Sequence, residues 1–280
     1  SETVALDAVG AECVREVVAG KIVKIDLNNP ELKTTALNGD DTSLSHCAFE
    51  SVYLGSPASN HMGSGDREVY SVRKQFGMEL GKYFCYRFLT EMCQNLPAKL
   101  PDMVISIPDS GNPAALGFAH ASGIQFEIGL IRDHYSSRTF MSPEQKTREA
   151  GVQTKFRAVK RLLGGKRVVV VDDSLVRGTT LKWIVDLLKH QCQVKEVHVC
   201  IASPPILHPC PYGIDMKSHG ELIAAQKTEK EICDFIGADS LTYLPIDLFE
   251  KVLGGHKKPW CLGCFIGDYP GTDSIKKYSS

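Results

Sequence analysis

Four consecutive valines run into a pair of aspartates, and this feature constrains the fold more than any other. Residues 168–171 are β-branched throughout and lack the alternation of a strand with one solvated face. A strand buried on both faces belongs to a parallel sheet that helices cover on each side. A polar loop follows, and a helix is predicted from about residue 180 to 188. This succession of strand, loop and helix predicts an α/β fold.

The same succession recurs along the chain. Residues 103–107 are apolar, and a turn at 108–112 leads to a predicted helix start at Pro113. A weaker example begins with the apolar residues 197–202. Between the first two units lies a polar, weakly patterned stretch, residues 132–151, which is typical of a lid over a ligand site.

The N-terminal third contains one strong helix signal. Apolar residues recur every three or four positions from residue 68 to about 93, which predicts an amphipathic helix with its stripe in the core. Residues 23–27 alternate like a strand, and the polar residues 28–45 are predicted to form a linker. Packed structure is predicted to resume near Cys47.

Composition excludes several classes of function. The 280 residues are 43% hydrophobic and 23% charged, and the formal net charge is −1. This charge gives no basic field for nucleic acid, and no apolar run approaches the roughly 18 residues that cross a bilayer. The first residues lack a signal-peptide pattern, so a cytoplasmic protein without nucleic-acid or membrane partners is predicted. The 10 scattered cysteines indicate a metal site or buried thiols.

The loop after the four valines suits a ribose phosphate. Asp172 and Asp173 can accept hydrogen bonds from two neighbouring sugar hydroxyls, at the edge of a parallel sheet where ligands bind. Gly178, Thr179 and Thr180 offer backbone amides and hydroxyls to a phosphate at a helix N-terminus. The alternative is that the two aspartates merely cap the next helix.

The complete string VVVVDDSLVRGTT resembles the signature by which type I phosphoribosyltransferases bind 5-phosphoribosyl 1-pyrophosphate (PRPP). The segments IPDSGNPAALGFAHASGI, GLIRDHYSSRTF and IGADSLTYL extend this resemblance to the glutamine PRPP amidotransferase family, in the same order. The family's fold is a parallel sheet flanked by helices. The PRPP-binding residues that the resemblance implies are Asp172, Asp173, Ser174, Arg177, Gly178, Thr179 and Thr180.

The resemblance implies an enzyme, an amidophosphoribosyltransferase, that opens purine biosynthesis. It joins ammonia, released from glutamine, to PRPP with the help of Mg²⁺. The implied Mg²⁺ positions are Ser110, Asp172 and Asp173. The predicted lid matches the family loop that closes over PRPP, and its implied catalytic residues are Arg132, Tyr135 and Arg138. The lid departs from the family at His134 and Ser136-Ser137, and a solvated charged loop is the alternative.

A second constellation consists of cysteines. Cys261 and Cys264 form a C-x₂-C pair, a spacing that lets two thiolates reach one metal centre. Cys47 and Cys210 match cysteines that bind a [4Fe–4S] cluster in the iron–sulfur branch of the family. The alternatives are buried thiols and a zinc site. The remaining cysteines are interpreted as core or incidental residues: Cys13, Cys85, Cys93, Cys192, Cys200 and Cys233.

The resemblance also implies a domain organisation. Residues 1–45 resemble the end of a glutaminase domain with its linker, 46–254 the phosphoribosyltransferase domain, and 255–280 a cysteine-bearing tail. A homo-oligomer is expected, and the lid sequence Asp133-His134-Tyr135 looks plant-like, which adds the plastid stroma as a compartment. Two other functions stay open: transfer of PRPP to a purine or pyrimidine base, and a PRPP-sensing regulator without turnover.

Overall fold

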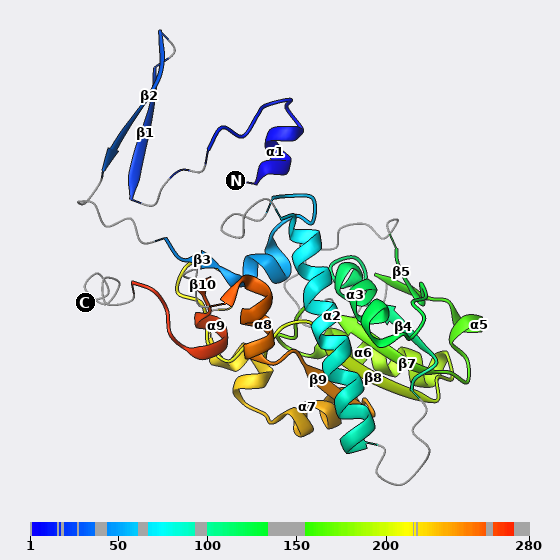
Figure 1. Cartoon of the computed structure of the whole chain (residues 1–280). Helices are drawn as coiled ribbons and strands as arrows, with labels where there is room; N and C mark the ends of the chain where they lie inside the picture. Colours follow the sequence, from blue (N-terminus) through cyan, green and yellow to red (C-terminus); the bar gives the residue numbers. More distant parts are fainter. Residues whose placement is uncertain are drawn as a thin grey trace.

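The structure is a computed structural model that describes residues 2–15, 17, 20–26, 28–36, 44–60, 67–92, 100–133, 155–214, 216, 218–255 and 260–271. Its centre is a parallel sheet with the strand order β4-β7-β8-β9 (Figure 1). These strands are β4 (Met103–Ser106), β7 (Arg167–Asp172), β8 (Glu196–Ile201) and β9 (Ser240–Tyr243). The predicted α/β class and the three predicted strands are confirmed.

The sheet has a topological switch point at β4. After β4 and α3 (Asn112–Ser122), the chain returns along one edge of β4, where Val104 forms a parallel bridge with Phe126. It then continues to β7, which pairs with the opposite edge of β4. The connections therefore diverge at the carboxyl ends of β4 and β7, the place where open α/β sheets bind ligands.

Helices cover both faces of the sheet, and each face has its own core. Val169 and Val171 point into one core, whereas Val168 and Val170 point into the other. The first core is covered by α2 (Val69–Arg87), α3 (Asn112–Ser122) and α8 (Ile246–Leu253). The second is covered by α5 (Lys160–Leu163), α6 (Thr179–Asp186), α7 (Glu229–Ile236) and the π-helical turn η3 (Leu187–Gln191). The four valines are all fully buried, as a strand between two layers requires.

The predicted long helix is α2, which continues as the π-helical turn η2 (Phe88–Met92). Its apolar stripe is buried as predicted. Glycines let α2 and α3 approach closely: a Cβ atom on Gly77 would lie 1.9 Å from the Ala114 carbonyl oxygen, and one on Gly117 would lie 1.9 Å from that of Lys74. This contact fixes the loop before α3 relative to α2.

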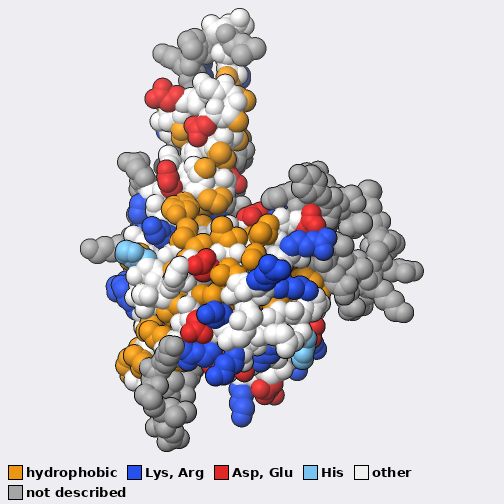
Figure 2. Space-filling model, turned by 90° about the vertical axis from the view of Figure 1, so that its right-hand side faces the viewer, with side chains coloured by type: hydrophobic (Ala, Val, Ile, Leu, Met, Phe, Trp, Pro, Cys, Tyr) orange, Lys and Arg blue, Asp and Glu red, His pale blue; other side chains and the backbone are white. Residues whose placement is uncertain are grey.

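The N-terminal residues contain a helix and a hairpin. After α1 (Thr3–Asp7), β1 (Lys21–Asp26) pairs antiparallel with β2 (Asn29–Ala36), and the hairpin projects from the body (Figures 1 and 2). The prediction of a linker over 28–45 is therefore wrong for residues 29–36. The second strand was missed because it is polar, and Thr34 and Thr35 are exposed.

The remaining short elements surround the body. They are β3 (His46–Cys47), η1 (Glu50–Leu54), β5 (Leu130–Arg132), β6 (Phe156–Ala158), η4 (His219–Glu221), η5 (Ile223–Ala225), β10 (Trp260–Cys261) and α9 (Gly263–Ile266). Packing resumes near Cys47 as predicted, since Ala48 and Phe49 are buried. No helix in the described ranges combines the length and the apolar character that a membrane span requires.

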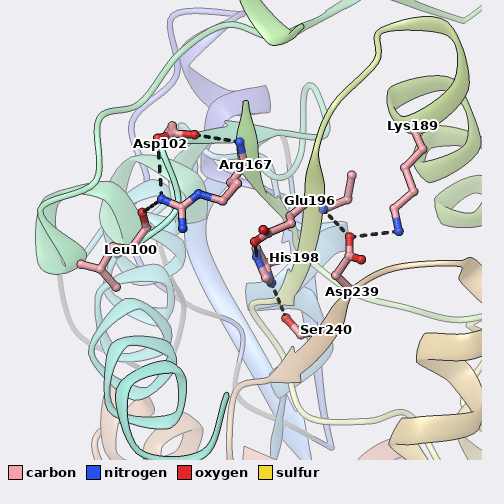
Figure 3. A network of polar contacts seen from close by, with 9 residues as sticks. Leu100, Asp102, Arg167, Lys189, Glu196, His198, Asp239 and Ser240 are labelled. Atoms are coloured by element: carbon pink, nitrogen blue, oxygen red, sulfur yellow. Dashed lines mark hydrogen bonds and ion pairs between the residues drawn. The ribbon is translucent and has the colours of Figure 1, made fainter. Parts of the chain in front are cut away.

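A network of polar side chains ties the amino ends of the strands together, at the edge opposite the switch point (Figure 3). The Arg167 guanidinium donates to the Leu100 carbonyl at 2.6 Å, and Asp102 accepts from the Arg167 amide at 2.9 Å. His198 bonds the Ser240 hydroxyl at 2.9 Å, and its ring meets Phe84 and Phe88 edge-on. Burial lowers the pKa of His198, although Glu196 beside it acts in the opposite direction.

This environment predicts a pH-dependent stability. The folded chain holds His198 neutral, whereas the unfolded chain takes up a proton near the usual pKa of about 6.5. Stability is therefore lost as pH falls through and below that value. A His198→Gln variant should be less stable at pH 7.5 by about 1–3 kcal/mol but lack this part of the pH dependence. Urea unfolding at pH 7.5 and 5.5 checks this, with the exposed His190→Gln as control; parallel pH profiles for His198→Gln and the unmutated protein would contradict it.

Candidate active site

The loop between β7 and α6 presents its polar groups at the switch point. Gly178 has φ of 77°, a conformation that favours glycine, and α6 begins at the next residue. Thr179 and Thr180 form the first turn of this helix, so their amides lie at its N-terminus. The Asp172 carboxylate accepts a hydrogen bond from the Asp173 amide at 2.9 Å. Gly178, Thr179 and Thr180 thus lie at the N-terminus of a helix, as the sequence predicts.

The loop after β4 lies directly beside it. The Ile107 amide donates to the Val171 carbonyl at 2.9 Å. A Cβ atom on Gly111 would lie 2.9 Å from that same carbonyl oxygen, so this close approach requires glycine. Ser110, on this second loop, hydrogen-bonds the Asp173 side chain. The structure therefore brings the predicted Mg²⁺ positions Ser110, Asp172 and Asp173 together.

The two aspartates have different surroundings. Asp172 is partly exposed, whereas Asp173 is 5% exposed and accepts from the Ser174 hydroxyl at 2.5 Å. Burial and mutual repulsion raise the pKa of Asp172 well above its usual range. Burial also raises the pKa of Asp173, while hydrogen bonds from Ser110 and Ser174 and the positive charge of Arg73 oppose the rise. Both aspartates line the cavity described below, but Asp173 is the more deeply buried of the two.

An open cavity of about 960 Å³ lies over these loops. Two cations enter it from the edge hairpin of β5 and β6: Arg132, from β5, and Lys155, which immediately precedes β6. Arg132 forms an ion pair with Asp109 at 3.0 Å, across the mouth of the cavity. The cavity also has apolar lining residues, among them Phe49, Tyr53, Leu54, Pro57, Ile214 and Met216.

Groups able to contact an anion line the cavity at two places. One is the N-terminus of α6, and the other consists of Arg132 and Lys155. Asp172 also lines the cavity and offers an acceptor to hydroxyls or to a cation. Arg177 lines the cavity too, and its guanidinium pairs with Glu221 at 2.8 Å. Of the predicted lid residues, Tyr135 and Arg138 lie outside the described residues, as do His134 and Ser136-Ser137.

Three charged residues that line this cavity were not predicted from the sequence: Arg73, Asp109 and Lys155. Arg73 is 3% exposed and donates to the carbonyls of Ser51 at 3.0 Å and Gly55 at 2.6 Å. The sequence did indicate that Arg73 is buried, because it stands four residues after Val69, on the apolar face of the helix. Lys155 and Asp109 stand in polar segments with no distinguishing pattern.

The four predicted cluster cysteines also come together. β10 pairs with β3 in a parallel register that sets Cys261 opposite Cys47. The thiol of Cys264 interacts electrostatically with those of Cys47, Cys210 and Cys261. Burial is the main cause that raises the pKa values of Cys47, Cys261 and Cys264, and proximity to other thiols adds to it. Of the other cysteines, Cys192 and Cys200 are buried in the cores, and Cys93 lies outside the described residues.

Comparison with known proteins gives consistent matches. The model of the phosphoribosyl transferase domain family matches residues 87–204. Chloroplastic amidophosphoribosyltransferase 1 of Arabidopsis thaliana is 44% identical over 270 residues, which are 96% of this chain and 44% of that protein. The amidophosphoribosyltransferase of Bacillus subtilis is 41% identical over 274 residues, 96% of this chain and 53% of that protein. The chain thus spans about half the length of these curated relatives.

Among solved structures, the glutamine PRPP amidotransferase of Bacillus subtilis in complex with ADP and GMP superposes with a TM-score of 0.80. It is 41% identical, and the match covers 96% of this chain and 56% of that one.

Proposed function

Because the chain belongs to the amidophosphoribosyltransferase family, we propose that it transfers the phosphoribosyl group of PRPP to ammonia, the first step of purine biosynthesis. The single observation that carries this proposal is the cavity in which the loop Asp172–Thr180 meets the loop 107–111. It combines a helix N-terminus for the 5-phosphate, carboxylates for the ribose hydroxyls, and two cations for the pyrophosphate.

The reaction is a displacement at C1 of the ribose. The ammonia nitrogen forms a bond to C1 while the bond from C1 to the pyrophosphate oxygen breaks, and the nitrogen then releases a proton to solvent. Negative charge grows on the departing pyrophosphate, where Arg132 and Lys155 would stabilise it. The predicted lid residues Tyr135 and Arg138 would complete this enclosure and exclude water, which competes with ammonia.

Mg²⁺ fits the carboxylate pair. Asp172 and Asp173 repel each other, and a divalent cation beside them would relieve this repulsion. Mg²⁺ binds to one or two carboxylates together with substrate phosphates, and Asp172 and Asp173 supply such carboxylates beside the cavity. Bound there with Ser110 nearby, it would neutralise charge on the pyrophosphate.

The decisive assay is release of pyrophosphate from PRPP. The purified chain, with Mg²⁺ and an ammonium salt at pH 8, is expected to release pyrophosphate in proportion to the ammonia present. Adenine, guanine, hypoxanthine or uracil in place of ammonia should give no release above that in water. Release with a base would favour a salvage transferase, and PRPP binding without release would favour a sensor.

We propose further that Cys47, Cys210, Cys261 and Cys264 hold a [4Fe–4S] cluster with a structural role. The support for this proposal is that the four thiols converge. Cys261 lies opposite Cys47 in the β3–β10 pair, and Cys264 interacts electrostatically with the other three thiols. The Cys210 sulfur accepts from the Tyr212 amide at 3.4 Å, the kind of hydrogen bond that tunes such clusters.

A reducing compartment suits these thiols. We therefore propose the cytoplasm, or the plastid stroma if the source is a plant, as the place of action. Two of the Arabidopsis relatives are named chloroplastic, and so is that of Glycine max. Fractionation of cells that express the full gene checks this proposal.

Arg132 offers a test of the pyrophosphate position. Loss of one charge-assisted contact costs about 1.5–3 kcal/mol, so Arg132→Ala should lower kcat/KM for PRPP by roughly 10- to 150-fold. Arg157→Ala is the matched control. Arg157 also stands on the β5–β6 hairpin in an exposed ion pair, with Asp133 at 3.0 Å, but it does not line the cavity. Equal kcat/KM values for the two variants would remove Arg132 from the proposed mechanism.

A further inference from the structure

Two tyrosines join the segments that carry the four cysteines. We propose that Tyr212 and Tyr269 are positioning residues that hold Cys210 against the Cys261–Cys264 turn, so that the thiols are arranged before a cluster is inserted and retained after it. We call these two side chains and their carbonyl acceptors the tyrosine clasp. The proposal rests on the cluster proposed above, but it concerns contacts that exist without one.

The clasp is reciprocal. The Tyr269 hydroxyl, from the C-terminal segment, reaches the carbonyls of Pro209 at 2.7 Å and His208 at 3.2 Å, directly before Cys210. The Tyr212 hydroxyl, two residues after that cysteine, donates to the carbonyl of Pro270. The two rings meet edge to face, with centroids 6.2 Å apart. Each segment therefore donates one hydroxyl to the backbone of the other, although they are separated by about 60 residues.

The Tyr269 ring also lies inside the C-x₂-C turn. A Cβ atom on Gly263 would lie 2.2 Å from Cδ1 of Tyr269, so only glycine leaves room for the ring between the two cysteines. The backbone confirms the same junction: the Cys264 carbonyl accepts from the amides of Leu207 at 2.8 Å and His208 at 3.1 Å. The ring thus packs against the turn on one side while its hydroxyl holds the other segment.

This arrangement matters because the four thiols come from distant parts of the chain. Cys47 and Cys261 are aligned by the β3–β10 pair, and Cys264 follows on α9. Cys210 lies outside these elements, between Pro209 and Pro211, and has no strand to place it. The clasp therefore fixes the position of Cys210. Without it, the fourth ligand would be held poorly, and the cluster would be lost more readily.

The first experiment removes only the hydroxyls. Tyr269→Phe and Tyr212→Phe proteins are reconstituted anaerobically with iron and sulfide, and the decay of the cluster absorbance in air-saturated buffer is followed. Loss of a hydrogen bond predicts a lifetime about two- to tenfold shorter in each variant. Tyr243→Phe is the matched control, because the Tyr243 hydroxyl is buried without a hydrogen-bond partner in the described part of the chain. Lifetimes equal to that of the control would overturn the clasp.

The second experiment tests the fit of the ring. Gly263→Ala expels the Tyr269 ring, so it should shorten the cluster lifetime to the same extent as Tyr269→Ala. The double variant should then be no worse than either single variant. Additive losses would show that Gly263 serves another purpose and that the ring does not position the turn.

A third measurement separates the clasp from the cluster. In protein kept free of iron, Tyr269→Phe and Tyr212→Phe should speed the alkylation of Cys210 and Cys261, read by mass spectrometry, relative to Tyr243→Phe. If the unmutated protein takes up no iron and sulfide but this acceleration is seen, the cluster proposal fails and the clasp stands. If the unmutated protein takes up the cluster but the acceleration is absent, the clasp fails alone.

Discussion

An Asp172→Asn variant is expected to lose at least about a hundredfold of kcat/KM for PRPP, and up to about a thousandfold, while it unfolds at the same temperature as the unmutated protein or higher. The loss combines the hydrogen bonds to the ribose hydroxyls with the charge that would attract Mg²⁺. The stability is kept because repulsion from Asp173 disappears, whereas the asparagine oxygen can still accept from the Asp173 amide.

Asp173→Asn should behave differently. Its carboxylate is 5% exposed, is hydrogen-bonded by Ser110 and Ser174, and is the main negative charge near buried Arg73. The neutral side chain would leave that guanidinium uncompensated, so this variant should lose both activity and several degrees of melting temperature. Both predictions are checked by measuring kcat/KM for PRPP and the melting temperature of each variant. Asp186→Asn is the control, because Asp186 is exposed on α6. Full PRPP turnover by well-folded Asp172→Asn would remove this loop from the proposed site.

These two aspartates show what a sequence can and cannot predict. A string such as VVVVDD fixes the strand and the loop, because burial on both faces and the polar switch that follows are local properties. That Asp173 is the more deeply buried carboxylate is connected with Arg73, 100 residues earlier in the sequence, and with the packing of α2 over the sheet. Sequence periodicity shows that Arg73 lies on the buried face of the helix, but it does not show what the guanidinium meets there.

Only the second strand of the β1–β2 hairpin was missed, and for another physical reason. A strand is recognised by alternating apolar and polar residues, whereas β2 is polar and its residues Lys33, Thr34 and Thr35 are exposed. In the C-terminal segment that carries Cys261 and Cys264, part of the site was predicted and part was not. The C-x₂-C pair was evident from the sequence, whereas the alignment of Cys261 with Cys47 follows from a parallel pair of only two residues on each side. Pairs that short carry no periodic signal.

The other large effect is expected at the cysteines. Anaerobically purified protein should be brown and contain about four irons and four sulfides per chain. Cys261→Ser should lose most of this signal, because Cys261 lies opposite Cys47 and near Cys210 and Cys264, and a hydroxyl is a poor ligand for iron in this setting. Cys192→Ser is the control, since Cys192 is a buried thiol that belongs to the second core.

Loss of the cluster should also weaken the fold near the tail. Leu262, Cys264 and Phe265 belong to the first core, and the Phe265 ring meets that of Phe249 on α8 at 5.2 Å. Without iron, buried thiols that share one site would remain with their pKa values raised, and thiolates formed at higher pH would repel each other. Cys261→Ser should therefore melt at a lower temperature and expose residues 260–271 to protease, whereas PRPP binding by the remaining folded protein should change little. Stoichiometric zinc without sulfide, or an unaltered iron and sulfide content in Cys261→Ser, would contradict the cluster and leave the proposed PRPP site untouched.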